Sequence, residues 1–159
     1  MREEAEFFQK KREEAIEKIC KAWNHDKSCF ICGRTEKELK TLGKELQIEH
    51  LIDENVGGKH KIIKSEGGSS NTYEVLNTQE NEIKNKFDLL CSDCNSLKNS
   101  AIRELMIYVI KQDFDTFEKI YKKFIGVIPK ELLYPSILAT AKNEGYEISF
   151  ETRKIKKVK

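Results

Sequence analysis

Two Cys-x-x-Cys motifs, Cys29–Cys32 and Cys91–Cys94, constrain the fold of this chain more than any other feature. Each motif places two thiols on one tight turn, and four thiolates complete the tetrahedral shell that structural zinc prefers. Because the motifs lie far apart in the sequence, a shared ion requires the chain between them to fold back on itself. The spacing therefore predicts a structural Zn²⁺ site with no open position, so any reaction must use other residues.

The segment between and just after the motifs contains three side chains suited to metal-assisted hydrolysis: Glu49, His50 and Asn95. An imidazole can accept a proton from water near neutral pH. Carboxylate and amide oxygens are hard ligands of the kind that Mg²⁺ takes, with water and a substrate phosphate completing its octahedron. These residue types together suit cleavage of a phosphodiester bond.

Their spacing resembles the HNH endonuclease family, the zinc-stabilised branch of the ββα-metal nucleases. In outline, that family has a Cys-x-x-Cys motif, an acid–histidine pair, and two glycines seven and eight residues after the histidine. A short apolar strand ending in Leu-Cys-x-x-Cys follows, and then an Asn or His and a nearby Lys. The matching residues are Glu49, His50, Gly57, Gly58, Leu90, Asn95 and Lys98.

The resemblance implies a metal-dependent DNA endonuclease with His50 as general base. It also implies that Glu49 and Asn95 hold a catalytic Mg²⁺ or another divalent cation. Asn95 acting only as the N-cap of the following helix is the alternative. Lys98 lies one helical turn after Asn95 and is expected to contact a phosphate, with a solvated lysine as the alternative.

The middle asparagine of the family motif, which orients the histidine, is matched to Asn85. Asn85 lies one residue further from Cys91 than in the usual pattern. Three other asparagines remain open for this role: Asn71, Asn77 and Asn81. Residues 53–85 are expected to form a long polar connection. Within it, Lys59 and Lys61 belong to a basic cluster that either contacts DNA or lies on a solvated hairpin.

The expected fold class is α+β: a ββα-metal core clipped by a four-cysteine zinc site, with helices added at both ends. We expect a single domain, 1–159. Its parts are an N-terminal helix in 1–28, the zinc-clipped core in 29–98, a helical extension in 99–150 and a basic tail in 151–159.

Apolar residues at helical spacing predict an amphipathic helix from 2 to about 23, which either packs on its own core or forms a dimer interface. Cys20, on its apolar stripe, is expected to be a small buried residue. A helix is expected from about Asn95. Asp115 and Glu118 are expected to form a capping box for the next helix.

Further along the chain, Pro135 is expected to interrupt a helix. Residues 146–150 alternate like a final strand, and the tail after them is expected to be mobile. The tail holds five basic residues and one acidic residue, whereas the net charge of the whole chain is +2. The basic excess therefore lies in the tail, and the overall charge is weak evidence for DNA binding.

The chain has 159 residues, of which 38% are hydrophobic and 35% charged, as expected for one modest core. It contains no apolar run near the roughly 20 residues of a membrane-spanning helix and no apolar N-terminal signal. We therefore expect a soluble cytoplasmic protein whose partner is DNA, not a membrane, with a homodimer or a larger nuclease complex left open. The alternative function is a non-catalytic zinc module that binds nucleic acid or another protein.

Overall fold

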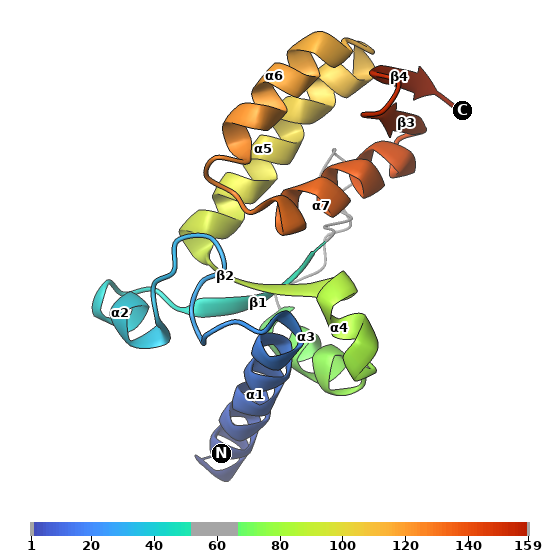
Figure 1. Ribbon diagram of the computed structural model, residues 1–159. Helices are drawn as coiled ribbons and strands as arrows, with labels where there is room; N and C mark the ends of the chain where they lie inside the picture. The colour runs from blue at the N-terminus through green and yellow to red at the C-terminus, as the bar shows by residue number, and fades with distance from the viewer. Residues whose placement is uncertain (1, 52–66, 159) are drawn as a thin grey trace. The chain divides into compact units, whose positions relative to one another are not determined.

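The computed structural model describes residues 2–51 and 67–158 (Figure 1). Contacts between them define two compact units, the first made of residues 2–51 and 67–95 and the second of residues 96–158. Helix α5 (Ser92–Ile110) begins in the first unit and continues in the second. The chain is mixed α and β, as expected, and the single-domain organisation stays a prediction.

The first unit contains a β-hairpin and helices packed around it. Its elements in chain order are α1 (Arg2–Trp23), α2 (Glu36–Thr41), β1 (Leu46–His50), α3 (Gly67–Leu76), α4 (Glu80–Lys86) and β2 (Phe87–Cys91). Helix α1 has the predicted bounds. Its buried face includes Ile16, Ile19 and Cys20, and the helix packs against α3 and α4. The interpretation that this stripe packs on its own core is confirmed, and Cys20 is a buried side chain as expected.

Strands β1 and β2 pair in antiparallel register, from Leu46 opposite Cys91 to His50 opposite Phe87. In β1, Leu46 and Ile48 are buried while His50 is exposed at the end of the strand. Strand β2 is buried along its whole length. The hairpin therefore forms the core of this unit, and both predicted strands are confirmed.

Helix α3 and all but the last residue of α4 lie within residues 53–85, where a polar connection was expected. That expectation is wrong for the described part, 67–85. Val75 and Ile83 are fully buried, and Lys18 of α1 donates to the carbonyl groups of Val75 and Leu76 at the end of α3. Tertiary packing and capping thus stabilise helices that lack a long apolar stripe. Gly57, Gly58, Lys59 and Lys61 lie outside the described residues.

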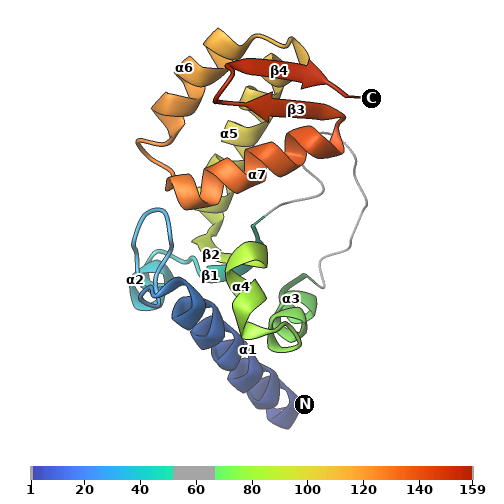
Figure 2. The same cartoon turned by 45° about the vertical axis from the view of Figure 1, so that its right-hand side comes forward.

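The second unit contains most of α5 together with α6 (Phe114–Phe124), α7 (Lys130–Asn143), β3 (Tyr146–Ser149) and β4 (Lys154–Lys157). Figure 2 shows the β3–β4 hairpin beside α7, against which β3 packs. The ring of Phe150, just after β3, lies 5.7, 5.8 and 5.1 Å from the rings of Phe114, Phe117 and Tyr121, respectively. This aromatic cluster fastens the end of β3 to α6.

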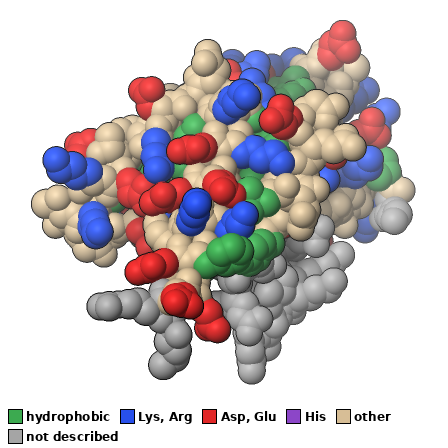
Figure 3. Space-filling model, turned by 90° about the horizontal axis from the view of Figure 1, so that it is seen from below, with side chains coloured by type: hydrophobic (Ala, Val, Ile, Leu, Met, Phe, Trp, Pro, Cys, Tyr) green, Lys and Arg blue, Asp and Glu red, His purple; other side chains and the backbone are tan. Residues whose placement is uncertain are grey.

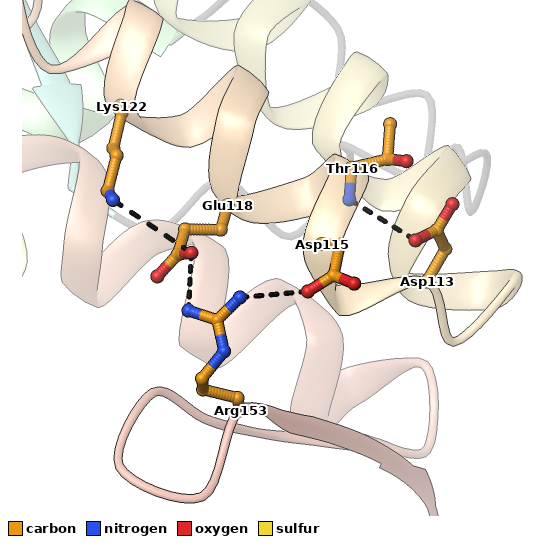
Figure 4. Close-up of polar contacts among 6 residues, drawn as sticks. All are labelled: Asp113, Asp115, Thr116, Glu118, Lys122 and Arg153. Carbon is orange, nitrogen blue, oxygen red and sulfur yellow. Dashed lines mark hydrogen bonds and ion pairs between the residues drawn. The ribbon is translucent and has the colours of Figure 1, made fainter.

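The start of α6 differs from the predicted capping box. Its N-cap is Asp113, whose carboxylate accepts from the backbone N–H of Thr116 at 3.2 Å. Asp115 and Glu118 instead bind the guanidinium group of Arg153, at 2.8 and 2.6 Å (Figure 4). Because Phe114 is buried, the helix begins there and Asp113 is its N-cap. Asp115 and Glu118 instead face Arg153 in the turn between β3 and β4.

Pro135 lies inside α7 and does not interrupt it, contrary to the prediction. Leu132 and Leu133 before the proline and Ile137 after it are buried. Burial on both sides of the proline holds the helix together despite the missing backbone donor.

The tail is ordered over residues 154–157, so the expectation of a mobile tail is wrong there. β4 pairs antiparallel with β3, and Ile155 lies opposite Ile148. Ile155 is 6% exposed, whereas the lysines beside it are exposed. One apolar side chain therefore anchors a strand whose composition is otherwise that of a basic tail.

We expect Ile155→Ala to destabilise the protein by about 2 kcal/mol or more, because it removes buried methyl groups and leaves a cavity. Urea denaturation followed by circular dichroism measures this change, with Lys156→Ala as the control that alters an exposed neighbour. Equal unfolding midpoints for the two variants would show that β4 does not anchor the tail.

Candidate metal centre and neighbouring polar site

The four cysteine sulfurs converge at one place in the first unit. The Sγ atoms of Cys29, Cys32, Cys91 and Cys94 all lie within 4.8 Å of one another, and those of Cys32 and Cys91 are 3.9 Å apart. Zinc–sulfur bonds of about 2.3 Å in a tetrahedron separate neighbouring sulfurs by about 3.8 Å. The cluster can therefore hold a metal ion.

Local backbone hydrogen bonds shape the first Cys-x-x-Cys loop. The N–H of Gly33 donates to the carbonyl of Cys29 at 2.9 Å, and the N–H of Cys29 donates to that of Arg34 at 2.9 Å. Gly33 has φ of 77°, a left-handed conformation that glycine adopts without strain. The N–H of Phe30 donates to the carbonyl of Leu89 at 2.9 Å, so the loop is attached directly to β2.

The second motif is placed by regular structure. Cys91 ends β2, and Cys94 lies in the first turn of α5. The backbone N–H of Cys91 lies 3.4 Å from the sulfur of Cys29 and donates to it. The turn from β2 into α5 therefore places the sulfurs of Cys91 and Cys94 beside the first Cys-x-x-Cys loop.

Burial and the neighbouring thiols affect the ionisation of the cluster. Burial raises the pKa of Cys94, and the nearby sulfur groups raise it further. Burial also opposes ionisation of Cys29, but the backbone N–H groups of Cys32, Cys91 and Ile31 outweigh it and lower its pKa. Four thiolates in this space repel one another, so complete ionisation of the cluster requires a cation among them.

Glu49 and His50 lie at the other end of the hairpin from the cysteines. His50 pairs with Phe87 and Leu46 pairs with Cys91, a separation of four positions or about 13 Å along the strand. Glu49 is half-buried and His50 is exposed. A metal ion in the cysteine cluster is thus too far along the strand to be bound by His50, in agreement with a structural role for it.

The imidazole of His50 lies between a carboxylate and an aromatic ring. Its Nε2 atom is 2.6 Å from Oε2 of Glu74 in α3. Its ring centroid lies 5.3 Å from that of Phe87, with the ring planes tilted by 39°. The side chain is therefore held on one edge and contacts an aromatic ring, while 44% of its surface remains accessible.

Helix α3 also contacts the backbone of β1. The side-chain amide of Asn71 donates to the carbonyl of Ile48 at 2.8 Å. Asn71 and Glu74 are three residues apart, so they lie on the same face of the helix. Sequence reasoning missed Glu74 because α3 was not predicted. The spacing of Asn71, Glu74 and the apolar Val75 is the available signal, and it is weak.

The remaining predicted residues have different surroundings. Asn95 is half-buried in the first turn of α5, which starts at Ser92, so the alternative of an N-cap at Asn95 is wrong. Asn85 is exposed on α4.

Lys98 is 2% exposed, so the solvated-lysine alternative is also wrong, and its phosphate contact stays a prediction. Among the four candidate asparagines, Asn71 is the one whose side chain contacts β1 through a recorded hydrogen bond.

On the face shown in Figure 3, acidic and basic side chains are interspersed among a few hydrophobic ones. None of the helices in the described part of the chain is both long enough and apolar enough to cross a bilayer.

Comparisons of this chain with protein-family models, with curated proteins and with solved structures found no match.

Proposed function

We propose that this protein is a metal-dependent DNA endonuclease with an HNH-type site, in which the four cysteines hold a structural Zn²⁺. The observation that carries the proposal is the placement of the Glu49–His50 pair. It ends one strand of a hairpin whose opposite end is fixed by the four-cysteine cluster. His50 is accessible and hydrogen-bonded on one edge, as a proton acceptor requires.

In the proposed reaction, His50 accepts a proton from a water molecule whose oxygen forms a bond to phosphorus. The bond between phosphorus and the leaving oxygen breaks, and that oxygen takes a proton from solvent. A divalent cation, when bound, would supply positive charge for the phosphoryl and leaving oxygens. By the resemblance to HNH nucleases, Glu49 and Asn95 would hold this cation through their oxygen atoms. Asn95 directly follows Cys94, so this assignment requires α5 to carry its side chain toward Glu49.

The described contacts favour Asn71 over Asn85 as the asparagine that supports the site. Asn71 holds the backbone two residues before His50, whereas Asn85 is exposed on a different helix. In this proposal, Asn71 holds the backbone of β1 and thereby positions the Cα atom of His50.

A non-catalytic zinc module that binds nucleic acid or a protein is the second candidate. The interspersed charges of the face in Figure 3 favour the protein-binding form of this module for that face, because a nucleic-acid groove usually has a positive surface. Nicking of plasmid DNA in the presence of Mg²⁺ or Mn²⁺ distinguishes the two candidates.

We expect one zinc ion per chain, measured by elemental analysis of purified protein. Cys91→Ser should lose the ion and unfold the first unit, because structural zinc contributes roughly 10 to 16 kcal/mol of apparent binding free energy. Cys20→Ala is the matched control, since Cys20 is the cysteine outside the cluster. A Cys91→Ser protein with unchanged metal content and melting temperature would contradict the zinc assignment.

His50→Ala should reduce the cleavage rate about 10²- to 10⁴-fold while zinc content, fold and DNA binding stay unchanged. The substitution removes the proton acceptor without removing a ligand of either proposed metal. His25→Ala, which alters an exposed histidine after α1, is the control for nicking assays. Full activity of His50→Ala would refute the catalytic assignment and favour the non-catalytic zinc module.

Asn95→Ala should raise the Mg²⁺ concentration needed for half-maximal cleavage, because it removes one oxygen ligand. A Mg²⁺ titration of the nicking rate measures this shift, with Asn143→Ala, which alters an exposed asparagine at the end of α7, as the control. An unchanged Mg²⁺ dependence for Asn95→Ala would remove Asn95 from the proposed metal site.

A further inference from the structure

We propose that Glu74 is a positioning residue that fixes the ring of His50 for proton transfer. This inference rests on the proposed function of His50 as general base. Its basis is the 2.6 Å contact between Nε2 of His50 and Oε2 of Glu74, which joins helix α3 to the last residue of β1.

The contact determines which ring nitrogen faces the water. A carboxylate accepts hydrogen bonds, so the proton between the two groups is donated by Nε2 of His50. The neutral ring then has its lone pair on Nδ1. Nδ1 is therefore the atom that accepts the proton from water, and Nε2 stays bound to Glu74 before and after the transfer.

The backbone of Glu74 is held in place by its neighbours in α3, which distinguishes this pair from two side chains on mobile segments. One turn earlier on the same face of α3, Asn71 donates to the carbonyl of Ile48 in β1 at 2.8 Å. The hydroxyl of Thr78 donates to the backbone carbonyl of Glu74 at 2.6 Å. Val75, beside Glu74, is fully buried.

The far end of α3 is attached to α1. The ammonium group of Lys18 lies 3.2 Å from the carbonyl of Val75 and 3.3 Å from that of Leu76. α3 is thus connected to β1 at its middle and to α1 at its end, and Glu74 lies between these attachments. The backbone that carries the Glu74 carboxylate is therefore held by both neighbours. Its contact with Nε2 restricts rotation of the His50 ring and leaves Nδ1 uncovered by Glu74.

This role predicts effects that a merely structural pair would not produce. Glu74 is half-accessible, with 50% of its side chain exposed, and even a fully charged pair at such an exposed position contributes little to stability. Its removal should therefore leave the melting temperature unchanged. Loss of an orienting partner should instead lower turnover, and only through His50.

The experiment uses the full-length, zinc-loaded protein with Glu74→Ala, Glu74→Gln and the control Glu82→Ala. Glu82 has similar exposure, 51%, and pairs with Lys86 on α4. Glu74→Ala should lower kcat for plasmid nicking about 10- to 100-fold with KM unchanged, by analogy with the carboxylates that orient metal-bound imidazoles. Glu74→Gln keeps an oxygen acceptor and should retain most of the activity.

The double variant tests whether Glu74 acts through His50. In a His50→Ala background, Glu74→Ala should have no further effect on the rate, because the partner that it orients is gone. An equal additional loss in that background would overturn the proposal. So would full activity of Glu74→Ala beside an inactive His50→Ala, an outcome that leaves the proposed nuclease function intact.

A readout independent of cleavage is the nuclear Overhauser effect between the rings of His50 and Phe87. It should persist in Glu74→Gln and Glu82→Ala and weaken in Glu74→Ala. If the wild-type protein does not cut DNA, the proposed function fails, and this signal alone decides the role of Glu74. An unchanged signal in Glu74→Ala would show that the ring is held without the carboxylate.

Discussion

The attachment of the first cysteine loop to strand β2 is the constraint on which the rest of the first unit depends. Phe30 donates to Leu89, and the N–H of Cys91 points at the sulfur of Cys29. These bonds bring two distant motifs together and fix one end of the β1–β2 hairpin. The register then determines where every later residue of β1 lies, including His50 four positions away.

The hairpin separates two chemical environments. At the cysteine end, four sulfur atoms, three of them on buried residues and that of Cys32 on an exposed one, lie close together in an arrangement that favours a soft cation. At the other end, an imidazole, a carboxylate and an aromatic ring lie partly in solvent. In the proposed function, this separation would let a metal ion in the cysteine cluster stabilise the fold without taking part in the reaction at His50.

The cysteine cluster and α1 could be predicted because each is indicated by several residues that lie close together in the sequence. Ligand spacing identifies the cluster, and a long apolar stripe identifies α1. Helices α3 and α4 could not be predicted in this way, since neither has a long apolar stripe and each depends on a few buried side chains, such as Val75 or Ile83, and on contacts with α1. Glu74 was missed for the same reason. The N-cap of α6 was misplaced because Asp113 and Asp115 are equally suitable in sequence, and only the burial of Phe114 decides between them.

The basic residues near the C-terminus lie on a strand, β4, of the β3–β4 hairpin. Among the described residues it is a two-stranded sheet, so the outer edge of β4 presents backbone groups that could pair with a strand from another molecule. Lys154, Lys156 and Lys157 are exposed along that edge. Bringing a second copy alongside would place like charges next to one another and bury them. The exposed lysines of β4 therefore oppose pairing of this edge with another strand, and keep the two-stranded ribbon from extending into a larger sheet.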